Sequence, residues 1–189
     1  MEFLVRALRN PARRYGALWF TANSIGDCPE IAFHILQNLT VNFTDILYDV
    51  MSQSTVRKKQ IEVVMWNLNN LLRLKIDIGS NGKDHLVNYM IRAAISVDDP
   101  DIYCEALMNL QYLTEMSCDN FKRILYNNQL IERILQLLHQ ASSRYESYQS
   151  LVIMAVMRCL GEFVSTCNIT EQLQTFFNLN GLEKLNNLL

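Results

Sequence analysis

Two tryptophan–asparagine pairs are the residues of this sequence whose types and spacing are best suited to binding chemistry. Trp66 and Asn70 are four residues apart, and Trp19 and Asn23 repeat that spacing. On a helix, residues four apart lie on one face, one turn from each other. An amide both donates to and accepts from a peptide backbone, and an indole packs against an alkyl chain or a cation. The pairs therefore predict a surface that holds another polypeptide segment.

The helix that carries Trp66 has a second, apolar face. Its apolar residues fall at spacings of three and four positions, which is typical of a helix packed on a core; they are Met65, Leu68, Leu71 and Leu72. Trp66 and Asn70 are therefore predicted to lie outside the core. For one pair alone, a half-buried structural tryptophan beside a capping or solvated asparagine is the alternative interpretation. The recurrence of the pair favours binding.

The composition indicates a folded, helical protein. Hydrophobic residues make up 50% of the 189 positions and charged residues 19%, with only 6 glycines and 3 prolines. The formal net charge of −2 argues against a nucleic-acid partner, which usually requires a basic excess. No apolar run approaches about 18 residues, so neither a membrane span nor a membrane partner is expected. Charges at Glu2, Arg6 and Arg9 argue against a signal peptide.

Residue types that often carry catalysis or bind metals are scattered. The 5 cysteines have no metal-ligand spacing, so they are interpreted as reduced thiols of a protein of the cytoplasm and nucleus. His34, His85 and His139 lie in different predicted helices, without a cysteine or acid at ligand spacing. No catalytic or phosphate-binding motif occurs. We therefore expect no metal, no cofactor and no enzymatic activity.

Local patterns predict helices along the whole chain. The expected ranges are 1–9, 11–25, 28–38, 40–52, 56–75, 84–96, 100–116, 119–128, 130–141, 145–166, 170–178 and 181–189. Gly26 is expected to stop the second helix, and residues 79–82 to form a loop. The acids Asp98, Asp99 and Asp101 are interpreted as helix caps rather than a cation site. Residues 57–59 are interpreted as the solvated start of a helix, with a weak basic patch as the alternative.

The helices recur with a long period. Trp19, Trp66, Met108 and Arg158 stand late in successive long helices, at separations of 47, 42 and 50 residues. Three-helix units of about this length are typical of armadillo and HEAT repeats, which stack into a superhelix with one concave surface. We expect an all-α fold, a right-handed α-solenoid of about four armadillo repeats, in one domain over residues 1–189. The approximate repeats are 1–26, 27–75, 76–117, 118–166 and 167–189, the first and last being partial. A globular helical bundle is the alternative.

Four successive segments resemble, in order, the repeats of the importin alpha family. They are ALWFTANSIGDCPE, MWNLNNLLR, DDPDIYCEALMNLQYLTE and MAVMRCLGEFVST. The first two are similar to that family's Trp-x-x-x-Asn repeats, the third to a repeat with Tyr at the Asn position, and the fourth to one with Arg at the Trp position. The resemblance covers essentially the whole chain. It implies an adaptor in nuclear protein import that binds nuclear localisation signals, which are extended basic peptides, on its concave face.

The resemblance also implies roles for the corresponding residues. Tryptophan and asparagine side chains would clamp the peptide, Asp27 would bind its key lysine, and acids further along would bind its other cations. The expected peptide-binding residues are Trp19, Asn23, Asp27, Trp66, Asn70, Arg73, Asp101, Glu105, Tyr112, Glu115 and Arg158. The expected partners are basic segments of cargo proteins, and importin beta if an N-terminal arm lies outside this chain.

Several positions depart from the family pattern. Met108 and Glu162 stand where the family has Trp and Asn. Residues 14–16 replace an acidic approach to the first Trp of the family pattern, and Arg13 adds to the positive charge there. The chain carries no basic importin-beta-binding segment, and it is expected to begin and end inside the family's array of repeats. These departures leave a second hypothesis open. In it, the chain is an armadillo scaffold in a stable multiprotein assembly, with its peptide groove degenerate or repurposed.

Overall fold

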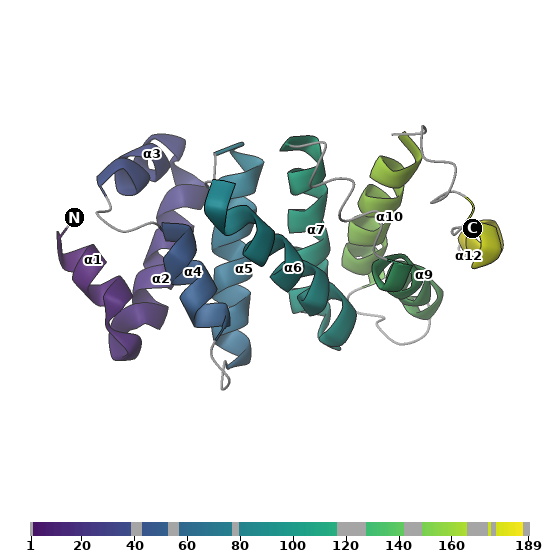
Figure 1. Cartoon of the computed structure of the whole chain (residues 1–189), viewed down its shortest axis with the longest axis horizontal. Coiled ribbons are helices and arrows are strands. Elements are labelled where there is room, and N and C mark those ends of the chain that lie inside the picture. Colours follow the sequence, from purple (N-terminus) through teal and green to yellow (C-terminus); the bar gives the residue numbers. More distant parts are fainter. Residues whose placement is uncertain are drawn as a thin grey trace. The chain divides into compact units, whose positions relative to one another are not determined.

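Every regular element in the described part of the chain is a helix, so the all-α prediction is confirmed (Figure 1). The computed structural model describes residues 2–38, 43–52, 57–76, 80–116, 128–141, 149–165, 174 and 177–186. The chain divides into two compact units, Met1–Tyr89 and Met90–Leu189. The boundary between them falls within helix α6 (Ser80–Ser96). None of the described helices is both long enough and apolar enough to cross a membrane.

The first unit begins with two helices joined by a tight turn. The helices described in this unit are α1 (Glu2–Arg9), α2 (Pro11–Asp27), α3 (Pro29–Asn38), α4 (Phe43–Met51), α5 (Lys58–Arg73) and the start of α6. Asn10 caps α2, because its side-chain oxygen accepts the backbone N–H of Ala12 at 3.0 Å. Arg14 joins α2 to α1, because its Nε donates to the carbonyl oxygen of Leu8 at 2.7 Å. That hydrogen bond satisfies a carbonyl group in the last turn of α1.

The apolar faces of α4 and α5 form much of the core of this unit. α2 contacts α1, α3 and α5, and α4 lies on α5. The apolar stripe predicted for α5 is buried, and the prediction is confirmed; its residues are Met65, Leu68, Leu71 and Leu72. The apolar residues of α4 that are also buried are Phe43, Ile46, Leu47 and Val50. Burial of each large apolar side chain contributes about 1.5–3 kcal/mol, so these faces hold the two helices together.

Polar side chains of α5 bind the backbone of α2. The donor–acceptor pairs are Asn67–Leu18 at 2.9 Å, Asn70–Ala22 at 2.8 Å and Arg73–Gly26 at 3.3 Å, each ending on a carbonyl oxygen of α2. Successive turns of α5 meet successive turns of α2 in the same order, so the two helices run parallel, side by side (Figure 1). We call this line of contact the α2–α5 seam. A hydrogen bond of this kind contributes about 1 kcal/mol, and it removes the cost of burying the amide.

The prediction that Gly26 ends the second helix is wrong. α2 continues through Gly26 to Asp27, and Cys28 is its C-terminal cap. A Cβ atom at position 26 would lie 3.0 Å from Nδ2 of Asn70. Gly26 is therefore needed for the close approach of the two helices at the seam, and not for a turn.

Alanine substitutions at the two glycines of α2 are expected to change stability in opposite directions. A Cβ atom at Gly16 would meet no atom within 4 Å, so Gly16→Ala should raise the free energy of unfolding by about 0.5–1 kcal/mol. Gly26→Ala should lower it by about 1 kcal/mol, because the methyl group displaces the hydrogen-bonded amide of Asn70. Urea denaturation followed by tryptophan fluorescence measures both values. An equal gain in the two variants would contradict the close contact at the seam.

In the second unit, α10 packs against two of the other helices. The helices described here are the end of α6, α7 (Pro100–Met116), α9 (Asn128–Ala141), α10 (Gln149–Ser165) and α12 (Gly181–Asn186). α10 packs against α7 and α9, and α12 packs against α9 (Figure 1). The thiol of Cys159 on α10 donates to the carbonyl oxygen of Leu107 on α7 at 3.3 Å. As at the seam of the first unit, a side chain of one long helix thus binds the backbone of another.

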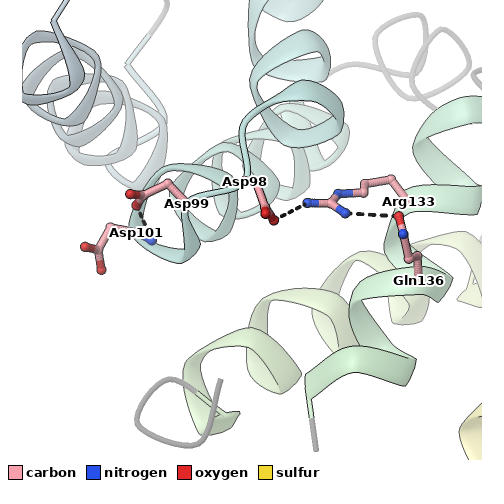
Figure 2. A network of polar contacts seen from close by, with 5 residues as sticks. All are labelled: Asp98, Asp99, Asp101, Arg133 and Gln136. Atoms are coloured by element: carbon pink, nitrogen blue, oxygen red, sulfur yellow. Dashed lines mark hydrogen bonds and ion pairs between the residues drawn. The ribbon is translucent and has the colours of Figure 1, made fainter. Parts of the chain in front are cut away.

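Arg133 of α9 binds the segment that leads into α7 (Figure 2). Its guanidinium group lies 3.4 Å from the carboxylate of Asp98 and donates to the side-chain oxygen of Gln136 at 3.0 Å. The same group stacks over the ring of Tyr103 on α7, 5.6 Å from the ring centre. Arg133 therefore combines an ion pair, a hydrogen bond and a cation–π contact in one side chain.

The starts of three helices bear on the remaining fold predictions. Residues 80–82, expected in a loop, belong to α6; Ser, Asn and Gly are also favoured at helix N-termini, so the same residue types mark a helix start here. At the start of α7, Asp99 accepts the N–H of Asp101 at 3.2 Å, which confirms the capping interpretation for that acid (Figure 2). Residues 57–59 are exposed at the start of α5, as predicted. Predictions for residues 117–127, 142–148 and most of 170–178 lie outside the described residues.

Candidate functional site

Both tryptophans of the chain lie beside the α2–α5 seam. Trp19 is 53% exposed, and Trp66 is half-buried. Trp19 directly follows Leu18, and Trp66 directly precedes Asn67, whose side chain is hydrogen-bonded to Leu18. The two indoles are therefore attached at nearly the same height along the seam.

The two indoles also lie on the same side of the seam. Trp19 is attached about 60° around α2 from Ala22, in one sense of rotation, and Trp66 about 40° around α5 from Asn70, in the opposite sense. Because the helices are parallel and face each other at Ala22 and Asn70, opposite rotations lead to the same side. The residues attached along this side are Trp19, Asn23 and Asp27 of α2 and Trp66 and Arg73 of α5, and we call them the seam face.

Asn70 does not lie on an exposed face, so the prediction of its placement is wrong. It is 5% exposed, its Nδ2 donates to Ala22, and its amide packs against the backbone at Gly26. The residue pattern of α5 alone does not predict this burial. It depends on α2, which has small residues and carbonyl oxygens that can accept a hydrogen bond where the two helices meet. Asn70 therefore holds the seam that positions the two indoles.

The polar side chains of the seam face differ in the hydrogen bonds and ion pairs that they form. Asn23 donates to the carbonyl oxygen of Trp19 at 2.9 Å, one turn back in α2. Arg73 is exposed and donates to Gly26 at the C-terminal end of α2, where a cation is favourable. Asp27 is exposed and forms no ion pair or hydrogen bond within the described part of the chain. A carboxylate is thus left available at one end of this face.

A second carboxylate, Glu30, lies just beyond the same end of α2. The thiol of Cys28 donates to Oε2 of Glu30 at 3.1 Å. This hydrogen bond, followed by one from the backbone N–H of Glu30 itself, lowers the pKa of Glu30 below its usual value. Glu30 was not singled out from the sequence, although an acid three positions after Asp27 was a visible signal. Glu30 strengthens the negative charge near Asp27.

In the second unit, the expected site residues of α7 form one stripe. Asp101, Glu105, Met108, Tyr112 and Glu115 follow each other at spacings of three and four, so they share one face of the helix. Each of them is at least partly exposed. We call these residues the α7 stripe. It carries carboxylates toward both ends and a thioether in the middle.

Arg158 of α10 lies beside the middle of the α7 stripe. Its Nη1 is 3.9 Å from the sulfur of Met108, and Arg158 itself is exposed. Met108 and Arg158 follow Trp19 and Trp66 in the long period of the sequence. This unit therefore offers a thioether and a guanidinium group where the first unit offers two indoles. The side chain of Glu162, the other departure from the family pattern, lies outside the described residues.

Burial controls the acid–base behaviour of α7. Oε2 of Glu105 is buried and has no hydrogen-bond partner among the described residues. Burial, and secondly the charge of Asp101, raises the pKa of Glu105 above its usual value. Burial, followed by the charges of Glu105 and Asp101, raises the pKa of Cys104 to about 12. Cys104 is therefore a protonated core thiol of low reactivity at neutral pH.

Glu105→Gln is expected to stabilise the protein at neutral pH but not in acid. The pKa of Glu105 is raised in the folded state, so folding takes up a proton between the unfolded and the folded pKa of this group. As the pH rises above the unfolded pKa, Glu105 therefore lowers the free energy of unfolding. The neutral amide removes that cost, so the free energy of unfolding should rise by about 1 kcal/mol at about pH 7.5 and should not change near pH 4. Urea denaturation at both pH values measures the difference. Glu132→Gln, at an exposed position of α9, is the control, and an equal change in both variants would contradict this cause.

Two buried asparagines were not singled out from the sequence. Asn67 and Asn109 are fully buried, and each directly follows a residue of the long period, Trp66 or Met108. An amide at the same place in two units, 42 residues apart, was the signal that could have found them. At Asn67 the structure gives the reason, since its amide is one of the donors at the α2–α5 seam.

Among the described residues, no group of three or more His, Cys, Asp or Glu side chains is arranged to hold a metal ion. Cys28, Cys104 and Cys159 form no disulfide bond among the described residues, and Cys118 and Cys167 lie outside those residues. Comparison with protein-family models and with curated proteins finds no match for this chain. Inference of function therefore depends on the geometry and chemistry of the two faces.

Proposed function

We propose that this chain is an armadillo-type module, related to importin alpha, that binds extended basic peptides and acts as an adaptor in nuclear protein import. The right-handed solenoid of about four repeats belongs to this proposal, as do a location in cytoplasm and nucleus and a link to importin beta through an arm outside this chain. The observation that carries it is the seam face. Two indoles are attached at nearly one height on one side of a helix pair, and Asp27, at one end of the same face, has no ion pair or hydrogen bond to another described residue.

The seam face has the groups that a lysine-rich peptide requires. Indoles on neighbouring helices can take the alkyl stem of a lysine between them, and their rings attract its ammonium group. Asp27 supplies an acceptor for a charge-assisted hydrogen bond. Asn23 adds an amide for the peptide backbone. In the second unit, the acids of the α7 stripe are proposed to attract further basic residues of the ligand.

Titration with a labelled peptide of the Lys-Lys-x-Lys type tests this proposal. Because the chain has only 2 tryptophans and both belong to the seam face, their fluorescence reports contact at that face. We expect a Kd in about the micromolar range at low salt, and weaker binding at moderate salt as screening increases. Asp27→Lys should weaken binding about tenfold or more, because it turns attraction for the ammonium group into repulsion.

Asp45→Lys is the matched control for this titration. Asp45 is an exposed acid of α4 in the same unit, and its substitution makes the same change in net charge. Equal weakening by the two variants would mean non-specific attraction, and no binding at low salt would contradict the proposal. Asn70→Ala does not serve as a binding variant, because the buried amide of Asn70 holds the seam itself.

A scaffold in a stable multiprotein assembly is the second candidate function. Exposed apolar side chains on α1, α2 and α3 favour it, since such side chains gain free energy when a protein partner covers them. These side chains are Phe3, Phe20, Ile31 and Phe33. Absence of peptide binding together with a defined protein partner that covers these residues would favour the scaffold over the adaptor.

A further inference from the structure

A third aromatic side chain, Tyr15, lies beside the two indoles of the seam face. Tyr15 precedes Trp19 by four residues on α2, so the two side chains are one turn apart on the same side of that helix. Around α2, Tyr15 is attached about 20° from Ala22, in the same sense of rotation as Trp19. Tyr15 is 41% exposed. We call Tyr15, Trp19 and Trp66 the aromatic cluster.

A carboxylate lies across the seam from Tyr15. Glu62 precedes Trp66 by four residues on α5, on the same side of that helix. In the register of the hydrogen bonds across the seam, Glu62 is attached at nearly the height of Tyr15. Side chains of a helix lean toward its N-terminus, so both indoles lean toward Tyr15 and Glu62. Three rings and a carboxylate thus border one area of the seam face.

Charges around the aromatic cluster nearly balance. The carboxylate of Glu62 lies 3.5 Å from the ammonium group of Lys58. Lys59 is exposed about one turn further along α5. Asp27 follows Trp19 by eight residues, which is about 12 Å along α2. A ligand at the cluster therefore meets aromatic rings rather than an unpaired carboxylate.

Lysine and trimethyllysine differ in what they require from such a surface. An ammonium group is strongly hydrated and has three N–H donors, so it loses free energy where acceptors are scarce. Trimethylation keeps the positive charge, removes the three donors and adds methyl groups. A quaternary ammonium group is attracted to ring faces, and aromatic cages are a common means of recognising it. Three rings with nearly balanced charges around them therefore favour the trimethylated side chain.

We infer that the aromatic cluster binds a trimethylated lysine side chain of a peptide. The quaternary ammonium group lies among the three rings, on the side of Glu62, and the alkyl stem lies between the indoles. Asp27, at the other end of the seam face, is left for a neighbouring basic residue of the same peptide. The inference rests on the proposed function in one respect, namely that the seam face binds a lysine-containing peptide. It adds a modification of the lysine that the proposed function does not require.

Three labelled peptides titrated against the full chain test this inference. They share one sequence, and a single position carries lysine, trimethyllysine or the uncharged analogue of trimethyllysine in which carbon replaces the nitrogen. The trimethyllysine peptide should bind about tenfold more tightly than either of the others, because only it combines a positive charge with methyl groups for the rings. Quenching of tryptophan fluorescence locates the contact, since both tryptophans of the chain belong to the cluster.

Variants at Tyr15 assign this preference to the rings. Tyr15→Leu should reduce the preference for trimethyllysine to about twofold or less, whereas Tyr15→Phe keeps the ring and should retain the preference. Tyr48→Leu makes the same change at an exposed tyrosine of α4, whose ring contacts that of His85, and should also retain it. Circular dichroism of each variant shows whether its helices are formed.

The possible results separate this inference from the proposed function. Equal affinity for lysine and trimethyllysine, or a preference that persists in Tyr15→Leu, overturns the inference and leaves basic-peptide binding intact. Equal affinity for trimethyllysine and its uncharged analogue also overturns it, because recognition is then apolar. Binding of the trimethyllysine peptide alone supports the inference and contradicts recognition of unmodified lysine by the seam face. Binding of none of the three peptides overturns both proposals.

Discussion

Asn67→Asp is expected to lower the free energy of unfolding of the first unit by about 4 kcal/mol, a large part of the total stability of a typical domain. The side chain of Asn67 is fully buried, and its Nδ2 donates to Leu18 at 2.9 Å and to Val63 at 2.7 Å. Aspartate has nearly the same shape, but it replaces this donor by a charged acceptor that faces two carbonyl oxygens. Burial of a charge without a partner costs several kcal/mol. Urea denaturation followed by tryptophan fluorescence measures the loss at the seam itself.

Asn69→Asp is the matched control, since it makes the same chemical change two residues away on α5. Asn69 is partly exposed and forms no hydrogen bond among the described residues, so its substitution should change stability by less than about 0.5 kcal/mol. The Asn67 variant should also regain stability in acid, where the buried carboxyl group becomes neutral. Losses of similar size in the two variants would mean that Asn67 does not hold α5 against α2.

Arg133→Ala is expected to lower the free energy of unfolding of the second unit by about 3 kcal/mol, the second largest effect. The side chain is only 12% exposed, and the substitution removes its ion pair with Asp98 together with its contact on the ring of Tyr103. It also leaves a cavity where the aliphatic part of the side chain was packed. Hydrogen exchange of residues 128–141, or urea denaturation followed by circular dichroism, measures the loss.

Two further variants separate the causes of this effect. Arg133→Met keeps the aliphatic part and removes the charge, together with a buried Nε that has no hydrogen-bond partner among the described residues. It should therefore cost about half as much as alanine. Arg92→Ala removes an exposed arginine of α6 in the same unit and should have an effect below about 0.5 kcal/mol. A loss at position 92 equal to that at position 133 would show that the contacts in Figure 2 contribute nothing specific.

The sequence determined most of the helices and their apolar faces. Periodicity and capping are local properties, so α1, α3, α4 and α7 occur close to their predicted ranges, and the apolar stripe of α5 is buried as expected. Proline after a capping residue set the starts of α2 and α7 correctly. The long period also selected Trp19 and Trp66, which the structure places on one side of the α2–α5 seam.

Only the tertiary structure decided what Asn70 and Gly26 do. From the sequence, Asn70 was predicted to be exposed and Gly26 to end a helix, because polar residues usually face water and glycine usually interrupts helices. Packing of α5 on α2 reverses both roles, since the missing side chain at position 26 admits the amide of Asn70, and a carbonyl oxygen of α2 accepts its proton. Whether a polar group is buried depends on a hydrogen-bond partner in another segment of the chain. The spacing of residues within one helix does not specify that partner.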